Sequence, residues 1–218
     1  MRTIQSFLIA FFAITLQFSF SANAQIPRDA VYEKAMANAL AQLDSAQTAA
    51  QLQQTKNQFE RIAQKYSGEW MPLYYAAYCG INSVFYDMKS AQNEALLTEA
   101  EERIEKLHAF SQADPSEINT LQAYSLTARV ALNPQVNGQK YFAEIIRLYE
   151  EAMNENPENP RPIVCLANFE SHLPDFIKSN KRKPEEEYAK ARALFEKEQP
   201  NIERPYWGRY FLEIRHKQ

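Results

Sequence analysis

Apolar residues recur at intervals of three and four through most of the chain after residue 24, which is the spacing of one face of an α-helix. One apolar stripe runs through residues 31–43. A second runs through 52–66 and stops at Ser67–Gly68, where a glycine is expected just past a helix end. The segment 70–86 is apolar almost all round, which predicts the most buried helix.

Capping residues and prolines mark the later helices. Ser90 is a predicted cap for a helix that reaches Leu107, and Asp114–Pro115 opens the next one. Asn133–Pro134 and Asn137–Gly138 predict a turn before a helix that is lined by residues from Phe142 to Ala152 and ends near Asn156–Pro157. Further helices are expected after Pro160, Pro184 and Pro205, and the last of them carries Trp207, Tyr210, Phe211 and Ile214 on one stripe. With no convincing strand, the pattern predicts an all-α fold.

The first 24 residues have the pattern of an export signal. One positive charge at Arg2 precedes an apolar run over 7–20, and the small residues Ala22–Asn23–Ala24 form a cleavage site before Gln25. A membrane anchor is the alternative, but it needs about 20 apolar residues and this run is shorter. We therefore expect residues 25–218 to form one soluble domain that is periplasmic or secreted, with no stable membrane insertion.

Composition removes several classes of function. The formal net charge of −3 argues against a nucleic-acid partner, which favours a basic face. Only 4 glycines are present, and they lie too far apart to form a phosphate-binding loop. The chain has no HExxH, paired histidines, Asp-rich calcium loop or GxSxG motif. No enzyme activity, cofactor or metal site is predicted.

The two cysteines allow two interpretations. Export would expose Cys79 and Cys165 to oxidising conditions, in which a disulfide can form. Both residues lie among apolar helical neighbours, so two buried and unpaired thiols are the preferred interpretation.

Internal repetition follows from the helix pattern. Ile145, Tyr149, Ala152 and Pro157 follow spacings of four, three and five, and apolar or small residues continue the register at Ile163, Leu166 and Ala167. Looser copies run through Phe59, Ile62 and Ser67, through Leu73, Ala76, Ala77 and Gly80, and through Leu121, Tyr124, Ser125 and Ala128. On these residues the region from Thr48 to Asn168 resembles the tetratricopeptide-repeat family, specifically short exported proteins of the Bacteroidetes type.

The resemblance implies antiparallel helical hairpins stacked as a short right-handed solenoid, with residues 184–218 forming capping helices. An irregular bundle of hairpins is the alternative. In the family, the concave face lined by first helices binds a peptide or partner protein. On this face the resemblance places candidate partner-binding residues at Tyr74, Tyr78, Asn82, Gln122, Arg129, Arg161, Asn168 and His172. The alternative is that the tyrosines pack against neighbouring helices, and this is favoured because an aromatic stripe at helical spacing more often belongs to the core.

Three functions therefore stay open. The first is a non-enzymatic interaction or scaffold module that uses the concave face. The second is an envelope component that self-associates through the aromatic C-terminal helix around Trp207. The third is a hydrolase without a readable motif.

Overall fold

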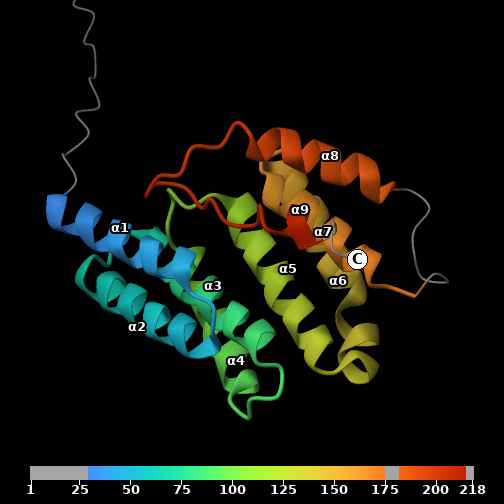
Figure 1. The fold of residues 1–218 in the computed structure, drawn as a ribbon, viewed down its shortest axis with the longest axis horizontal. Coiled ribbons are helices and arrows are strands. Elements are labelled where there is room, and N and C mark those ends of the chain that lie inside the picture. The colour runs from blue at the N-terminus through green and yellow to red at the C-terminus, as the bar shows by residue number, and fades with distance from the viewer. Residues whose placement is uncertain (1–28, 175–181, 215–218) are drawn as a thin grey trace, which may run out of the picture.

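The computed structural model describes residues 29–174 and 182–214, and the predicted signal over residues 1–24 lies outside them. The described residues contain helices and no strand, which confirms the all-α prediction (Figure 1). The helices are α1 (Ala30–Ser45), α2 (Ala49–Lys65), α3 (Trp70–Tyr86), α4 (Asn93–Leu107), α5 (Pro115–Leu132), α6 (Pro134–Glu155), α7 (Pro160–Ser171), α8 (Pro184–Phe195) and α9 (Phe211–Ile214).

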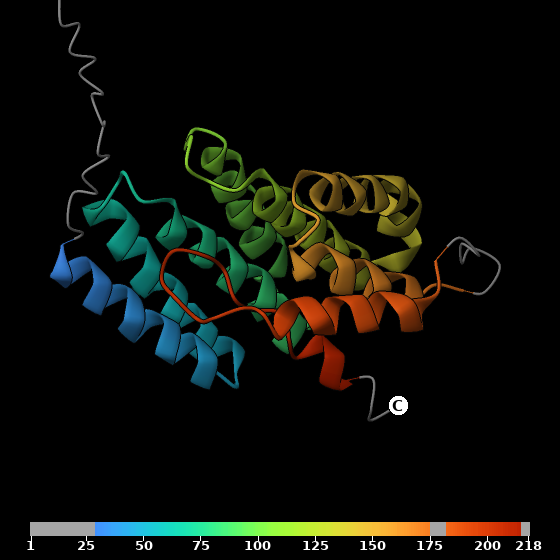
Figure 2. The same cartoon turned by 90° about the horizontal axis from the view of Figure 1, so that it is seen from above.

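Consecutive helices pack as hairpins, and the hairpins stack side by side (Figures 1 and 2). Helix α5 contacts both α3 and α7, so these three helices form an inner row, while α2, α4 and α6 pack on its outer side. Helix α3 is buried along nearly its whole length, as its apolar sequence predicts. Small side chains allow close approach at Gly80, which lies beside Ala100 and the Leu96 carbonyl of α4.

Contacts between successive hairpins recur at a constant sequence spacing. The Lys56 ammonium binds the Glu99 carboxylate at 2.8 Å, and the two residues are 43 positions apart. The Tyr74 hydroxyl donates to Glu117 at 2.7 Å, again across 43 positions. One stacked unit is therefore about 43 residues long, which is longer than the roughly 34-residue tetratricopeptide period. The resemblance to that family stays a prediction.

Two predicted boundaries are wrong for local reasons. Helix α4 begins at Asn93, because the Ser90 hydroxyl accepts from the Gln92 N–H in a turn that precedes the helix. Helix α6 begins at Pro134 and contains Gly138. The side chain of its N-cap residue Asn133 accepts from the Val136 N–H, and Pro134 follows at the first helical position. This start stabilises the helix enough to offset the free-energy cost of about 1 kcal/mol that one glycine adds within it.

The predicted helix from Pro205 is also wrong, since only Phe211–Ile214 is helical among the described residues there. Residues 205–212, hereafter the C-terminal segment, lie over the inner row of helices, so they do not cap the end of the stack (Figure 2). Gly208 has φ 102°, and an added Cβ would lie 3.3 Å from Arg161 and Phe195. A glycine is therefore required where this segment turns against α7 and α8.

The two cysteines are buried and unpaired, as the preferred interpretation of the sequence has it. Burial raises the pKa of both the Cys79 and the Cys165 thiol.

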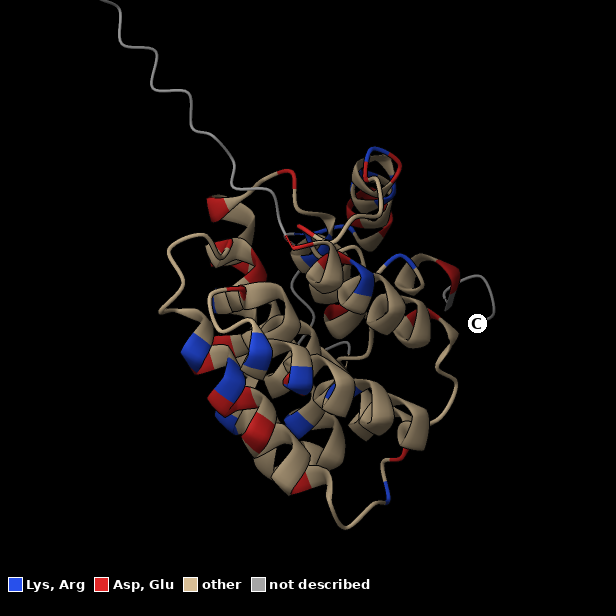
Figure 3. Cartoon of the chain, turned by 90° about the vertical axis from the view of Figure 1, so that its left-hand side faces the viewer, with Lys and Arg blue, Asp and Glu red and all other residues tan. Residues whose placement is uncertain are grey.

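Charged side chains of both signs lie on the surface of the outer helices, where the Arg103 guanidinium contacts Glu60 (Figure 3). Within the part of the chain that the structure describes, no helix is long and apolar enough to cross a bilayer.

A closed set of buried polar contacts joins the inner row to the C-terminal segment. Glu117 of α5 accepts from the Tyr74 hydroxyl of α3 and from Arg161 Nε of α7, both at 2.7 Å. Arg161 also donates to the Trp207 carbonyl at 3.3 Å and to Glu198 at 2.7 Å. The Trp207 indole N–H donates to the Tyr74 hydroxyl at 2.7 Å, which closes the ring.

Burial dominates the electrostatics of this network. Desolvation raises the pKa of the Glu117 carboxyl, and the Arg161 charge together with the two hydrogen bonds opposes that rise. The side chains of Glu117 and Arg161 are only 3% and 4% exposed, so each ion depends on the other for compensation.

We expect Arg161→Met to destabilise the protein by about 3–5 kcal/mol at neutral pH, because it leaves the buried Glu117 carboxylate without its cation. Without the guanidinium the pKa of Glu117 rises further above its unfolded value. The native state then holds a proton that the unfolded state releases, and stability falls as pH rises through the folded pKa. The loss should therefore shrink near pH ~4. Urea unfolding at both pH values measures it.

Arg147→Met is the matched control, because Arg147 pairs with Glu144 and Glu151 on an exposed face of α6. It should change the unfolding midpoint far less. Adding Glu117→Gln to Arg161→Met should recover part of the lost stability. A loss of equal size in both single variants would contradict a central role for the buried pair.

Candidate functional site

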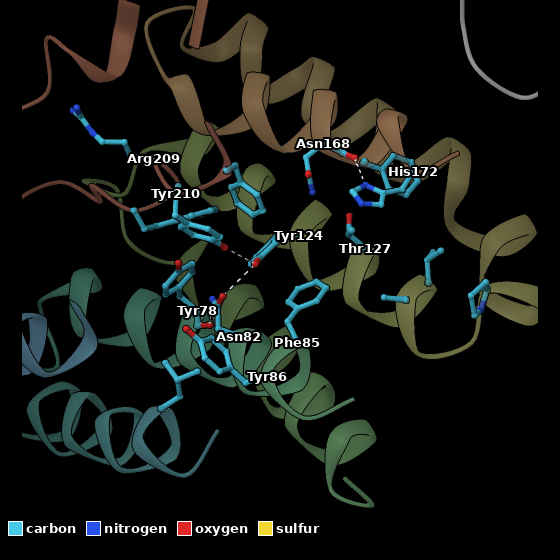
Figure 4. Close-up of a pocket in the computed structure, with 18 of the residues that line it drawn as sticks. Tyr78, Asn82, Phe85, Tyr86, Tyr124, Thr127, Asn168, His172, Arg209 and Tyr210 are labelled. Atoms are coloured by element: carbon cyan, nitrogen blue, oxygen red, sulfur yellow. Dashed lines mark hydrogen bonds between the residues drawn. The ribbon is translucent and has the colours of Figure 1, made fainter. Parts of the chain in front are cut away.

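A cleft of about 1500 Å³ lies between the inner row of helices and the C-terminal segment (Figure 4). Helices α3, α5 and α7 form its walls. The end of α1 closes one side and the start of α6 closes the other. Its lining is mainly apolar and aromatic. The volume exceeds the roughly 300–1,000 Å³ of most small-molecule sites, so the cleft is large enough for a large ligand.

Four rings line one side of the cleft, and we call Tyr78, Phe85, Tyr124 and Trp207 the aromatic floor. Trp207 lies 4.6 Å from Tyr78 and 5.4 Å from Tyr124 between ring centres, at interplanar angles of 33° and 29°. Phe85 stacks on Tyr124 at 5.2 Å and 29°. The rings are thus roughly parallel and stack on one another, which makes a rigid aromatic cluster in the wall of the cleft.

Hydrogen bonds fix the tyrosines of the floor. The Tyr124 hydroxyl contacts Asn82 Oδ1 at 3.2 Å and the Tyr210 hydroxyl at 3.1 Å. The Asn82 amide donates in turn to the Tyr78 carbonyl at 2.9 Å. Burial raises the pKa of both Tyr78 and Tyr124, so their phenols stay neutral at physiological pH.

Asp44 and Arg209 are the charged side chains of the described cleft lining. Asp44 accepts from the Tyr206 hydroxyl at 2.9 Å. Arg209 donates to the Phe195 carbonyl, and its guanidinium lies 5.8 Å from the centre of the Phe195 ring. Figure 4 shows Arg209 at the edge of the site. Because a carbonyl is neutral, the bond to Phe195 leaves the Arg209 charge available to an anionic ligand group at the edge of the cleft.

A histidine lies at the opposite end of the lining. His172 follows α7 as its C-cap, is exposed, and sits beside Asn168 and Thr127 (Figure 4). Its Nδ1 lies 2.8 Å from the Asn168 carbonyl oxygen. The Thr127 hydroxyl donates to the Ala123 carbonyl within α5.

The structure brings together half of the predicted site residues. Tyr78, Asn82, Asn168 and His172 all line the cleft, as expected for the inner face of the helical stack. Tyr74 lies one turn from Tyr78 but is fully buried, because Glu117 and Trp207 cover its hydroxyl. The expectation that Tyr74 faces the groove is therefore corrected.

Three other predicted residues lie away from the cleft. Arg161 is buried in the ion-pair network. Arg129 turns to the outer side of α5, where it binds Glu101 at 2.6 Å and Glu94 at 2.8 Å. Gln122 is half-buried and does not line the cleft. Arg129 and Arg161 pair with glutamates of their own chain, and Gln122 is absent from the cleft lining. The predicted place of these three residues on the concave face is therefore corrected too.

Sequence reasoning missed Phe85 and the position of the C-terminal segment. Phe85 follows Tyr78 by seven residues on α3, and this two-turn spacing was the signal that could have revealed it. Trp207 was expected to form part of a terminal helix, yet it is 7% exposed and packs into its own chain.

The described residues contain no group of three or more histidine, cysteine, aspartate or glutamate side chains arranged to hold a metal ion. The described residues thus form a stack of helical hairpins with a large cleft lined by aromatic side chains.

No protein-family model and no curated protein matches the chain. Among solved structures, the chain is similar to the HusA haemophore from Porphyromonas gingivalis, with 29% sequence identity and a TM-score of 0.73. The likeness covers 84% of this chain and 92% of that one.

We expect Trp207→Ala to cost about 3–5 kcal/mol, because it removes a buried ring from the floor and the hydrogen bond to Tyr74. Tyr206→Phe is the matched control. It removes only the hydrogen bond to Asp44 at the edge of the cleft, which is worth at most about 1.5 kcal/mol. Urea unfolding followed by circular dichroism compares the two. Equal stability of Trp207→Ala and the parent would show that the C-terminal segment is not anchored by this ring.

Proposed function

We propose that this protein is a non-enzymatic binding protein that holds a haem-type porphyrin in the aromatic cleft. The observation that carries the proposal is the nearly parallel aromatic floor in a cleft of about 1500 Å³. The likeness to the HusA haemophore over 84% of the chain supports it.

The chemistry of the cleft suits a flat, apolar macrocycle. Tyr78, Tyr124 and Trp207 give the cleft an aromatic wall, and an aromatic contact contributes about 0.5–1.5 kcal/mol beyond the area that it buries. The carboxylates of such a ligand would lie at the mouth, where the Arg209 guanidinium bonds only a neutral carbonyl and can pair with them. The apolar body would then be buried while the charged edge keeps its hydration.

Export belongs to the same proposal. The signal pattern at residues 1–24 supports it, as does the likeness to a haemophore. A protein that captures a ligand outside the cytoplasm needs a preformed site, and the ring of contacts among Tyr74, Glu117, Arg161 and Trp207 supplies one.

A peptide in the same cleft is the second candidate. The resemblance to tetratricopeptide repeats implies it, and the size of the cleft together with Asn168 in its wall favours it. Self-association through the C-terminal aromatic residues has less support, because Trp207 and Phe211 are each 7% exposed and pack within their own chain.

We expect ferric haem and metal-free protoporphyrin to bind in a one-to-one ratio with Kd of about 1 µM or tighter. The chain has 2 tryptophans, so Trp70→Phe leaves Trp207 as the sole one, and its fluorescence should be quenched as the ring stacks. Ala131→Trp should weaken both porphyrins at least about tenfold, because it fills a half-buried position in the lining. Absorbance and fluorescence titrations measure these effects.

Gln135→Trp is the matched control, since it adds the same side chain at an exposed position of α6 that does not line the cleft. It should bind porphyrin like the parent. Failure of the parent to bind either porphyrin would overturn the proposal, and saturable binding of extended peptides at the same site would favour the second candidate.

A further inference from the structure

We infer that the C-terminal segment undocks from the inner row of helices as a unit, and that a ligand in the cleft binds the docked form and so holds the segment in place. The docked form is the one that the structure shows. The inference rests on the proposed function for the identity of the ligand, and it adds a conformational device that retains the cargo.

The C-terminal segment supplies a continuous part of the cleft wall. Six consecutive residues, from Tyr206 to Phe211, belong to the described lining, and no other stretch of the chain contributes as many in a row. Side chains of α3, α5 and α7, among them Tyr78, Tyr124 and Asn168, form the rest of the wall around them. A ligand that fills the cleft therefore touches the segment and the helices at once.

Side chains attach the segment to the helices. The Tyr206 N–H donates to the Tyr75 hydroxyl at 3.3 Å, and the Trp207 indole N–H donates to the Tyr74 hydroxyl at 2.7 Å. Among the described residues, no backbone-to-backbone hydrogen bond joins residues 205–212 to the inner row. An element that is held by a few side-chain contacts can open locally while the packed helices stay folded.

Residues 199–204 form the hinge on which the segment would move. They follow α8, contain no helix, and are exposed except for the half-buried Ile202. The Asn201 side chain accepts from the N–H groups of Glu203 and Arg204 at 2.8 and 2.9 Å, so these two bonds lie within the hinge itself. Undocking at this hinge leaves the packing of α7 against α8 intact.

The aromatic floor couples the segment to the ligand. Trp207 packs on Tyr78 and Tyr124, and the Tyr210 hydroxyl lies 3.1 Å from the Tyr124 hydroxyl. Undocking separates Trp207 from both tyrosines, so it breaks the floor and removes a wall together. A ligand that contacts the floor thus prefers the docked form. By linkage, the ligand stabilises docking as much as docking strengthens ligand binding.

Hydrogen exchange at single amides of the mature chain, followed by NMR, tests the coupling, with metal-free protoporphyrin as the ligand. In the free protein, the amides of residues 206–208 should exchange faster than the buried amides of α3 and α5, because the segment opens without global unfolding. Protoporphyrin at about 100 times its Kd should slow exchange at residues 206–208 by about 100-fold, because only the docked form binds it.

Tyr74→Phe separates docking from ligand contact, because Tyr74 anchors the Trp207 indole but does not line the cleft. In the free protein it should speed exchange at residues 206–208 by about 2–10-fold, which corresponds to the loss of one hydrogen bond. Tyr149→Phe is the matched control. Tyr149 is a buried tyrosine of α6 that does not line the cleft, and its loss of a hydroxyl should leave exchange at residues 206–208 unchanged.

Two results would overturn the inference. One is exchange at residues 206–208 that is as slow as in α3 and α5 in the free protein, since the segment would then not open by itself. The other is bound protoporphyrin that leaves this exchange unchanged. A parent chain that binds no porphyrin would instead overturn the proposed function and the coupling with it, whereas exchange in the free chain would still decide whether the segment undocks.

Discussion

The buried ion pair between Glu117 and Arg161 is the interaction on which the rest of the structure depends. It joins α5 to α7, and through the Tyr74 hydroxyl and the Trp207 carbonyl it extends to α3 and the C-terminal segment. Burying two charges costs free energy that only close mutual contact and additional hydrogen bonds repay. The helices must therefore keep their spacing for the pair to be tolerated, and that spacing determines the width of the cleft above them.

Helix positions were predictable because their signals are local. The apolar stripe of α3 and the Asp114–Pro115 start of α5 both specify a helix without reference to the rest of the chain. The start of α6 was mispredicted because Asn137–Gly138 resembles a turn, whereas the cap at Asn133 and the proline after it decide the outcome. The unit length of about 43 residues is visible only in contacts between hairpins, such as that of Lys56 with Glu99.

The cleft was predictable only in part, because burial depends on which partner each side chain meets. Tyr78 and Tyr74 share a helix face in the sequence pattern, yet one lines the cleft and the other lies beneath Trp207. No periodic signal places Trp207 there, since residues 205–210 are not helical and Gly208 turns the backbone through a positive φ. His172 lines the cleft because it extends the register of α7 by one turn from Asn168.

The C-terminal segment also has a consequence for the timing of assembly. Tyr206 contacts Tyr75 and Asp44, which precede it by 131 and 162 positions, and Trp207 completes the surface beneath the cleft. A chain emerging from the ribosome can form its early hairpins as they appear, but it lacks this surface until residues 205–212 have been made. Every chain that stops short of Trp207 therefore has an incomplete cleft lining.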